Sequence, residues 1–520
     1  MFKKIRTRFA PSPTGPLHVG GVRTALYAYL FTKKHGGDFL LRIEDTDQNR
    51  YVAGAEQYII DALAWAGINI DEGVPNGGPH APYRQSERKE LGIYEKYAGK
   101  LLKSGHAYYA FDTPAELEDM RNRLINAGNV APQYNSESRN SMSNSLTLNS
   151  KEVKARIDQG LPFVIRLKVP SGEEIGFTDI IRGEVIVNSS QVDDKVLLKS
   201  DGMPTYHLAH IVDDILMEIT HAIRGEEWLP SAPAHILIYR YLGLENEMPQ
   251  YAHLPLLLKP DGNGKLSKRD GDRLGFPVFP LNWTDPVTGE VSSGYRERGY
   301  YPEAFVNMLA LLGWNAGTEQ EIFSMDELIA QFSFEHVHKG GARFDPDKAK
   351  WFNEQYLRKQ SDKELAIRLK ENVISKFNFV VDDYRMNDLF LIHAIQLLKD
   401  RVQFENEILE KGRYLFETPA TWDQVVIEKK WKPSHLNFFN SLTEALNSSD
   451  QFLTTAIDEI VKATAISHQI KPGEIMQLLR VFISGQGSGV DLLGMMELLG
   501  KGEVVLRLKN GLQNLNFKVQ

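Results

Sequence analysis

Apolar residues recur at two kinds of spacing near the start of this chain of 520 residues. Residues 5–9 begin and end with an apolar residue and residues 38–43 are mostly apolar, and we predict a short buried strand in each stretch. Between them, apolar residues from 22 to 30 recur at the three-to-four spacing of one helix face, which predicts a helix beginning at Gly20. A strand, a helix and a strand within about 40 residues form a parallel crossover unit. The N-terminal region is therefore predicted to contain a parallel sheet flanked by helices.

The middle of the chain has a different composition. Residues 126–150 are rich in Asn, Ser and Gly, which is typical of a solvated surface. Alternating positions at 162–169 and 183–187 predict strands after it. We interpret this stretch as an α+β module inserted into the parallel sheet, which resumes near Tyr206. The pattern at 216–223 then predicts a half-buried strand.

The last third of the chain has a helical pattern. Between residues 347 and 470 there are one glycine and two prolines, and apolar residues recur at helical spacing. This predicts an all-helical C-terminal domain. By contrast, residues 273–294 contain three prolines and several glycines, which predicts a loop with little regular structure.

These patterns predict an α/β fold in five segments. The segments are 1–110 for the first half of the sheet domain, 111–200 for the inserted module, 201–260 for the second half of the sheet domain, 261–345 for a region with a lysine-containing loop and the extra segment 273–294, and 346–520 for the helical domain.

Composition narrows the functional classes. Hydrophobic residues make up 42% and charged residues 25%, as in an ordinary soluble globular protein. No stretch approaches the roughly 20 apolar residues that span a bilayer, and no signal peptide is evident, so we expect no membrane association. The chain has no cysteine, which excludes disulfides, thiolate catalysis and cysteine-bound zinc and is compatible with the cytoplasm. The net charge of −8 does not indicate a nucleic-acid binder, so any RNA must contact a local basic face.

A turn leads into the predicted first helix. Pro11–Gly15 interrupts regular structure, and His18–Gly21 opens the helix. Backbone N–H groups at a helix start favour an anion, Gly20 would let a nucleotide approach the backbone, and His18 could donate to a phosphate. The alternative is a capped helix start with a chance histidine. No Walker-type lysine loop is present, so a P-loop nucleotide site is not indicated.

A basic loop lies far along the chain, at Lys265-Leu-Ser-Lys268-Arg269. Glycines directly before it favour a flexible loop. Lys268 could stabilise the negative charge of a departing pyrophosphate. A solvated basic turn is the alternative interpretation.

Charged residues follow the predicted strands. Glu44–Asp47 comes after one strand, and Arg8 and Arg224 lie at the ends of others, so all should meet at the carboxyl edge of the sheet. A carboxylate there could hold an ammonium group or Mg²⁺, and arginine suits a carboxylate. Capping aspartates and ordinary surface ion pairs are the alternatives.

Two histidines and two aspartates are close together in the next stretch. The group, His207, His210, Asp213 and Asp214, invites a metal-site interpretation, but the spacing is unconvincing and structural histidines are favoured.

Seven motifs together resemble bacterial glutamyl-tRNA synthetases, which are class I aminoacyl-tRNA synthetases. His18–Gly21 and Lys265–Arg269 stand where the family has its "HIGH" and "KMSKS" signatures. In chain order the motifs are Arg8–Gly15, His18–Gly21, Arg42–Asp47, Tyr206–Ala209, Ile223–Trp228, Lys265–Arg269 and Trp351–Arg358. The resemblance extends from Arg6 to about Leu508.

The resemblance implies a fold and a reaction. It implies a Rossmann-type catalytic domain with an inserted acceptor-binding module, a stem-contact region and an all-α anticodon-binding domain. The substrates would be L-glutamate, Mg²⁺-bound ATP and tRNA(Glu), joined through a glutamyl-adenylate that transfers its glutamyl group to the terminal ribose. The resemblance also implies a cytoplasmic monomer.

The resemblance also assigns roles to residues. His18 and Lys268 would be catalytic, and no residue would be a metal ligand. ATP would contact Pro11, Ser12, Gly15, His18, Gly20, Gly21, Glu227, Lys265, Ser267 and Lys268. Glutamate would contact Arg8, Ala10, Ser12, Glu44, Tyr206, His210 and Arg224.

The sequence departs from the family pattern in three places. His210 stands where relatives commonly have asparagine. No cysteine is present to bind the zinc that many relatives carry in the inserted module, so we expect no zinc. The segment 273–294 is an apparent insertion.

In the helical domain, Lys429–Lys432 could contact phosphate and stack a base, or could be a solvated helix end.

Three other functions are alternatives to this one. A glutaminyl-tRNA synthetase is disfavoured by Arg224, because a neutral amide does not require a cation. A truncated paralogue that glutamylates a tRNA base is disfavoured, because such paralogues lack the C-terminal domain. A catalytically dead RNA-binding relative is disfavoured because His18, Lys268, Glu44 and Arg224 are all present.

Overall fold

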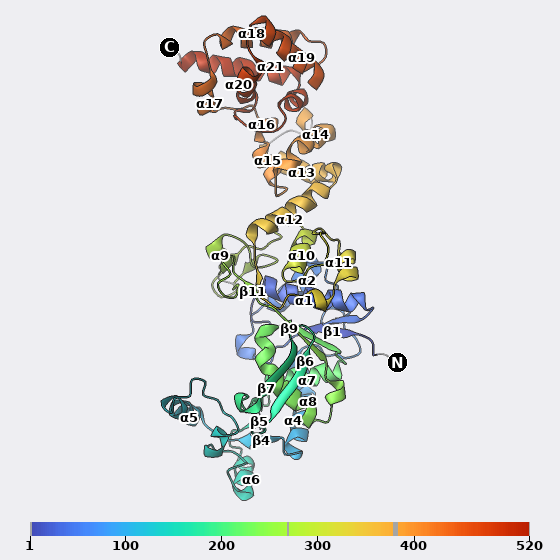
Figure 1. Ribbon diagram of the computed structural model, residues 1–520, viewed down its shortest axis with the longest axis vertical. Helices are drawn as coiled ribbons and strands as arrows, with labels where there is room; N and C mark the ends of the chain where they lie inside the picture. The colour runs from blue at the N-terminus through green and yellow to red at the C-terminus, as the bar shows by residue number, and fades with distance from the viewer. Residues whose placement is uncertain (1–2, 268–269, 378–382, 519–520) are drawn as a thin grey trace. The chain divides into compact units, whose positions relative to one another are not determined.

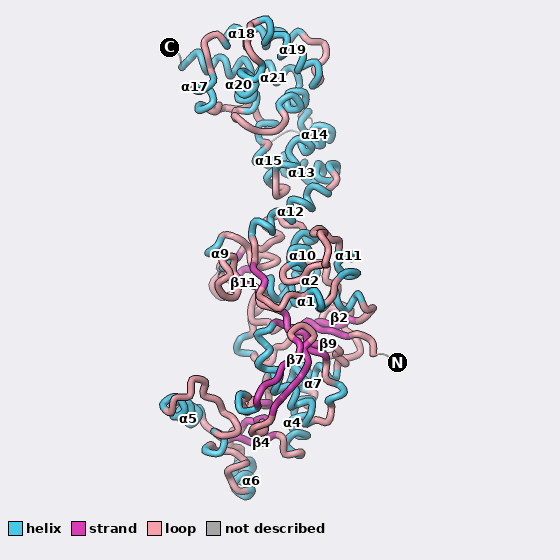
Figure 2. Tube along the Cα trace, in the orientation of Figure 1, coloured by secondary structure: helices cyan, strands magenta, loops and turns pink. Residues whose placement is uncertain are grey.

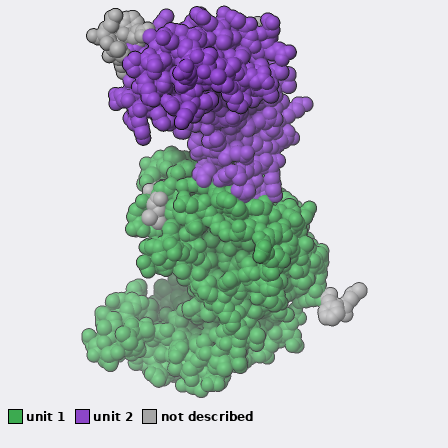
Figure 3. All heavy atoms as spheres, turned by 45° about the horizontal axis from the view of Figure 1, so that its top comes forward, with its two compact units in different colours: residues 1–352 green, residues 353–520 purple. Residues whose placement is uncertain are grey.

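The computed structural model describes residues 3–267, 270–377 and 383–518 (Figure 1). Residue contacts divide the chain into two compact units, residues 1–352 and 353–520 (Figure 3). The first unit contains the sheets, and in the second unit the described residues form helices without strands (Figure 2). The predicted α/β region followed by an all-helical region is confirmed.

A seven-stranded sheet forms the centre of the first unit. Its strand order is β3-β2-β1-β9-β10-β6-β7, with only the last pair antiparallel. The strands are β1 (Arg6–Phe9), β2 (Asp38–Leu41), β3 (Glu72–Gly73), β6 (Glu174–Asp179), β7 (Gly183–Asn188), β9 (His221–Gly225) and β10 (Gln250–Leu254). The chain runs outward from β1 to β2 and later returns on the other side of β1 as β9. Ligands bind at the carboxyl ends of strands where the order reverses in this way, which places a site beside β1 and β9.

The predicted strand–helix–strand unit is present at the start of the chain. Helix α1 (Val19–Lys34) connects β1 to β2 and buries Val22, Leu26 and Leu30 completely. The strand after it is shorter than predicted and ends at Leu41, because Ile43 makes only an isolated bridge to Arg84. The turn between β1 and α1 therefore lies at the carboxyl edge of the sheet.

The inserted module contributes strands to two different sheets. In a separate antiparallel sheet, β5 (Val164–Leu167) and β8 (Val196–Leu198) of the module join β4 (Ala107–Ala110), which directly precedes the predicted module. The module also holds helices α5 (Pro114–Asn126) and α6 (Ser150–Asp158). The β6–β7 hairpin instead extends the main sheet, because Asp179 is in register with Tyr251 of β10. Alternation of side chains predicts a strand but cannot identify its partner strand.

The structure corrects one local prediction. The predicted strand at 216–223 begins later, because Tyr206–Leu216 forms helix α7 and β9 starts at His221. The segment 273–294 has little regular structure, as predicted. Helix α9 (Asp270–Leu274) enters it, and β12 (Trp283–Thr284) pairs with β13 (Val291–Ser292) as a short hairpin.

The first unit contains further helices (Figure 1). They are α2 (Ala55–Trp65), α3 (Gln85–Glu90), α4 (Ile93–Lys103), α8 (Ala232–Tyr241), α10 (Pro302–Leu311), α11 (Met325–Gln331) and the start of α12 (Pro346–Lys359). Strands β11 (Leu257–Leu258) and β14 (Ala342–Arg343) form a two-stranded parallel sheet, and α10 and α11 lie between them in the chain.

The second unit is a helical domain, as predicted. Its helices are α13 (Asp362–Phe377), α14 (Asp388–Leu398), α15 (Glu407–Lys411), α16 (Arg413–Phe416), α17 (Gln424–Lys430), α18 (His435–Ser448), α19 (Thr454–Ser467), α20 (Pro472–Ser484) and α21 (Leu492–Lys518). The Trp431 ring, one candidate for base stacking, packs against Phe439 and Phe482 at centroid distances of 6.0 and 5.9 Å. Lys432 forms an ion pair with Glu474 at 3.1 Å. Trp431 therefore contributes to the packing of this unit.

Candidate active site

Two adjoining cavities open at the carboxyl ends of β1 and β9. One has a volume of about 420 Å³ and the other of about 450 Å³. Both are lined by His18, Gly20, Gly21, Gly225 and Glu227, so they form one continuous site. The sheet topology predicts a ligand site at this position.

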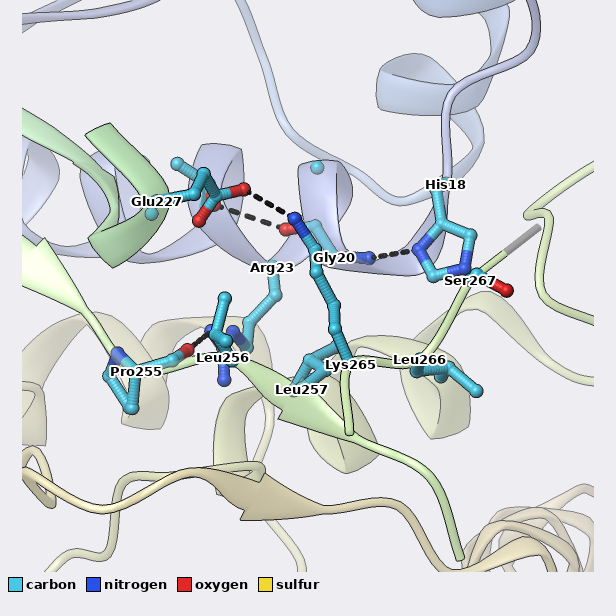
Figure 4. A pocket seen from close by; sticks show the side chains of 13 residues that line it. His18, Gly20, Arg23, Glu227, Pro255, Leu256, Leu257, Lys265, Leu266 and Ser267 are labelled. Carbon is cyan, nitrogen blue, oxygen red and sulfur yellow. Dashed lines mark hydrogen bonds and ion pairs between the residues drawn. The ribbon is translucent and has the colours of Figure 1, made fainter. Parts of the chain in front are cut away.

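The first cavity lies at the start of α1. His18 is the residue before the helix, and its Nδ1 accepts a hydrogen bond from the Gly20 N–H at 3.1 Å (Figure 4). A Cβ atom on Gly21 would lie 2.5 Å from the Leu17 side chain, so this glycine allows the turn to pack closely. The positive end of the helix faces the cavity, which favours an anion such as phosphate.

The extra segment after the lysine-containing loop contacts this helix start. The Val19 N–H donates to the Val278 carbonyl at 2.9 Å, and the Phe279 ring meets the His18 ring edge-on at 6.3 Å. The segment therefore packs beside the His18 turn.

A salt bridge crosses the first cavity. Lys265 extends from the loop after β11 to the Glu227 carboxylate at 2.8 Å, and both side chains are about half exposed (Figure 4). Ser267 is held by Asp270, which accepts from its backbone N–H at 2.8 Å and its hydroxyl at 2.6 Å. Lys268, predicted to be catalytic, and Arg269 lie outside the described residues.

The second cavity contains a buried network of charged residues from three elements. Arg8 is the next-to-last residue of β1, Glu44 follows β2, and His210 and Asp214 lie one turn apart on α7. Arg8 donates to Asp214 through two bonds of 3.0 Å, and the Arg42 guanidinium bonds Asp214 at 2.8 Å and Glu44 at 3.0 Å. Each carboxylate in this network therefore has an arginine partner.

His210 connects Arg8 to Glu44. Its Nε2 lies 2.7 Å from Arg8 Nη2 and its Nδ1 lies 2.9 Å from Glu44 Oε1. Burial lowers the pKa of His210, so the ring is neutral near pH 7. Since arginine only donates, Nε2 accepts from Arg8 and the Nδ1–H donates to Glu44. Burial by itself raises the pKa of the Glu44 carboxyl, but His210 and Arg42 outweigh burial and leave it below its ordinary value.

Arg224 differs from Arg8 and Arg42 because its hydrogen-bond partners are all neutral. Its Nε bonds His253 at 3.0 Å, and its Nη1 bonds the Tyr206 hydroxyl at 3.1 Å and His235 at 3.3 Å. Among the described residues, Arg224 has no carboxylate partner, and its buried Nη2 has no hydrogen-bond partner. The cavity is therefore lined by an uncompensated cation, meaning one without a carboxylate partner among the described residues, and its Nη2 nitrogen makes no hydrogen bond.

The aspartates of α7 and His210 have side-chain partners within the protein. His210 and Asp214 belong to the arginine network, and Asp213 accepts from Arg88 at 2.6 Å and Gln85 at 2.9 Å. Within the described parts of the chain, no three metal-ligating side chains are arranged to hold an ion.

Comparison with known proteins identifies the family. Residues 4–351 match the model for tRNA synthetases class I (E and Q), catalytic domain, and residues 364–512 match an anticodon binding domain. The chain belongs to the class I tRNA synthetases (E and Q). The family resemblance inferred from the seven motifs is thereby confirmed.

Individual relatives match this synthetase over nearly its whole length. It is 54% identical to a glutamate–tRNA ligase of Cytophaga hutchinsonii, covering 99% of both chains, and 51% identical to one of Amoebophilus asiaticus, again covering 99% of both. A crystal structure of a glutamate tRNA ligase from Elizabethkingia meningosepticum, in complex with its amino acid, is 48% identical with a TM-score of 0.93, and the match covers 98% of this chain and 99% of that one.

Every described residue that was predicted from the sequence to belong to the site of this synthetase lines one of the two cavities. The first cavity is lined by His18, Gly20, Gly21, Glu227, Lys265 and Ser267. The second is lined by Arg8, Ala10, Pro11, Ser12, Gly15, Glu44, Tyr206, His210 and Arg224, together with residues shared between the two.

Several residues of the synthetase's site were not predicted. Arg50 lines the second cavity, and Trp228 lies over Tyr206 with ring centroids 4.4 Å apart. Trp228 is 40% exposed. An aromatic residue that follows charged residues at a strand end is a sequence pattern from which its place in the site could have been predicted. His235 and His253 carried no local signal, because each is one buried histidine in an apolar stretch.

Proposed function

We propose that this synthetase ligates L-glutamate to tRNA(Glu). An oxygen of the glutamate α-carboxylate attacks the α-phosphate of Mg²⁺-bound ATP, and pyrophosphate leaves. A ribose hydroxyl of the tRNA terminus then attacks the acyl carbon of the glutamyl-adenylate, and AMP leaves. These steps need orientation and charge stabilisation, and no covalent enzyme intermediate.

The observation that carries the proposal is the uncompensated Arg224 cation. A glutamate side chain brings the carboxylate that this cation lacks among the described residues, where the buried Nη2 has no hydrogen-bond partner. Glutamine would leave the buried charge without a counter-ion, which is costly. The relatives named above as glutamate–tRNA ligases support the same choice, and the glutaminyl alternative has no such support.

The remaining groups match the rest of the substrate. Glu44 is ionised and keeps Oε2 for the glutamate ammonium, while Arg8 and Tyr206 line the same cavity. ATP would occupy the first cavity, with its phosphates at the start of α1 and near Lys265. Mg²⁺ arrives with the ATP phosphates. We propose that His18 and Lys268 are the catalytic residues.

The tRNA would contact both units. The helical unit includes the match to an anticodon binding domain, and the inserted module would hold the acceptor end. We expect the enzyme to act as a monomer in the cytoplasm. Among the described residues, no helix combines the length and apolar character needed to cross a membrane.

A charging assay tests the proposal. Purified tRNA(Glu) and tRNA(Gln) are each incubated with the enzyme, ATP, Mg²⁺ and labelled glutamate or glutamine. Glutamylation of tRNA(Glu) is expected, with no transfer of glutamine to either tRNA. Transfer of glutamine would support the glutaminyl alternative, and absence of any charging would indicate a catalytically inactive relative. Glutamylation of tRNA(Gln) would show that the anticodon contacts accept both tRNAs.

A further inference from the structure

A buried aspartate–histidine pair lies directly behind Arg224. Asp179 is the last residue of β6 and His253 lies on the neighbouring strand β10, and both side chains are fully buried. Asp179 Oδ2 is 2.6 Å from His253 Nδ1, and His253 Nε2 is 3.0 Å from Arg224 Nε. The three side chains therefore form one line of hydrogen bonds that ends in the second cavity.

The direction of each hydrogen bond in this line is fixed. Arg224 can only donate, so His253 Nε2 must carry a lone pair and the ring proton must lie on Nδ1. An ionised carboxylate can only accept, and Asp179 accepts that proton. The opposite tautomer would place two N–H groups against each other at Arg224.

Asp179 is itself held rigidly by backbone groups. Its Oδ1 accepts from the N–H groups of Ile181 and Arg182 at 2.9 and 2.8 Å, and its Oδ2 accepts from the His253 N–H at 3.1 Å. Burial raises the pKa of the Asp179 carboxyl, but His253 and these N–H groups lower it further, so the carboxyl is ionised. Burial also lowers the pKa of His253 and keeps the ring neutral. The charges of Arg224 and Arg182 lower this pKa further, whereas Asp179 raises it.

The imidazole also separates two opposite charges. If Asp179 contacted Arg224 directly, the cation would be neutralised and a substrate carboxylate would gain little. With His253 between them, Arg224 is oriented by a neutral acceptor and keeps its charge for the ligand. The ring of Tyr251, 5.1 Å from the guanidinium, adds a second neutral contact.

We propose that Asp179 and His253 are positioning residues, which fix the Arg224 guanidinium for the substrate side chain and so determine the preference for glutamate over glutamine. This inference rests on the proposed function and extends it, because it assigns selectivity to a strand of the inserted module that does not line the cavity.

Asp179→Asn is the first test, measured as tRNA(Glu) charging by the full-length enzyme. The amide keeps an oxygen for the N–H groups of Ile181 and Arg182. It presents its N–H₂ group to His253 Nδ1, which selects the wrong tautomer, and the His253 backbone N–H loses its acceptor. The KM for glutamate is expected to rise about 10-fold or more, the preference over glutamine to fall, and the KM for ATP to stay unchanged. The control is Asp194→Asn, another fully buried carboxylate of the inserted module, which bonds Tyr108 and Arg139 and is expected to leave the KM for glutamate unchanged.

A double-mutant cycle separates positioning from a structural role. In His253→Gln the amide oxygen can accept from Arg224, and an amide has no tautomer that Asp179 must select. Adding Asp179→Asn to this variant should therefore raise the KM for glutamate much less than it does in the wild type. A purely structural role of Asp179 predicts the same increase in both backgrounds. If Asp179→Asn does not fold, His253→Gln is compared with His253→Phe, which has a ring without an acceptor and should have the higher KM for glutamate.

The outcomes are distinct. A wild-type enzyme that does not charge tRNA(Glu) with glutamate overturns the proposed function. A wild-type enzyme that does so, combined with unchanged KM values or additive effects in the cycle, overturns only the positioning role. A raised KM for glutamate with coupling between the two substitutions supports it.

Discussion

The Arg8 guanidinium and the Asp214 carboxylate face each other in a two-bond fork, with Nε–Oδ1 and Nη2–Oδ2 distances of 3.0 Å each. Both side chains are almost completely buried. The fork neutralises Arg8 within the protein, whereas Arg224 has no carboxylate partner among the described residues. The two arginines, both predicted to contact glutamate, therefore have different electrostatic environments.

Replacing Arg224 should abolish glutamate recognition and leave nucleotide binding intact. We expect Arg224→Leu to raise the KM for glutamate by about 10- to 100-fold or more, because it removes charge-assisted hydrogen bonds, and to leave the KM for ATP unchanged. Steady-state charging kinetics measure both constants. The control is Arg240→Leu, a partly exposed arginine on α8 with ion pairs to Glu173 and Glu245. A normal KM for glutamate in Arg224→Leu would contradict the assignment.

Replacing Asp214 should destabilise the first unit. Asp214→Asn leaves Arg8 and Arg42 without their shared counter-ion, and breaking a buried pair costs about 3–5 kcal/mol. The melting temperature measured by calorimetry should fall by several degrees. Asp119→Asn, which changes an exposed carboxylate on α5, should leave it nearly constant. Equal melting temperatures for the two variants would show that the network adds little to stability.

Replacing Lys268 should slow adenylate formation. Removing one group that stabilises developing charge costs about 100- to 1,000-fold in rate, so Lys268→Ala should slow pyrophosphate exchange to that extent with the KM for glutamate little changed. The exchange is measured with tRNA present. Lys96→Ala, an exposed lysine on α4, is the matched control. Near-normal exchange in Lys268→Ala would exclude the catalytic role.

Buried His221 should make stability depend on pH. Burial lowers the pKa of His221 to about 4, with a smaller effect from His35, whereas a histidine in the unfolded chain titrates near 6.5. Between these values the unfolded state binds a proton that the folded state does not bind. The free energy of unfolding therefore decreases as pH falls through this window, by up to about 1.4 kcal/mol per pH unit.

The variant His221→Gln should lose this part of the pH dependence. The readout is the change in melting temperature between pH 7 and pH 5, which should be smaller than in the wild type. His338→Gln replaces an exposed histidine and should behave like the wild type. An unchanged pH dependence in His221→Gln would show that the His221 ring is protonated in the folded state.

Much of the candidate site could be predicted from the sequence because its groups lie in short, local motifs. The residues between β1 and α1 and those following β2 and β9 are each contiguous, and a parallel sheet brings the carboxyl ends of its strands to one edge. Periodicity also predicted α1 and the helical second unit. It misplaced the start of β9, since apolar residues around 208–216 are compatible with either a strand or a buried helix.

The sequence by itself determined which chemical groups reach the site: an anion-binding helix start, a lysine-containing loop, a carboxylate and two arginines. Only the tertiary structure decided which of these charges are already neutralised. Asp214 joins Arg8 across 206 positions, and Asp179 joins His253 across 74. Such pairings depend on strand order and register, which side-chain alternation does not specify, because it records which face is buried and not which neighbour covers it.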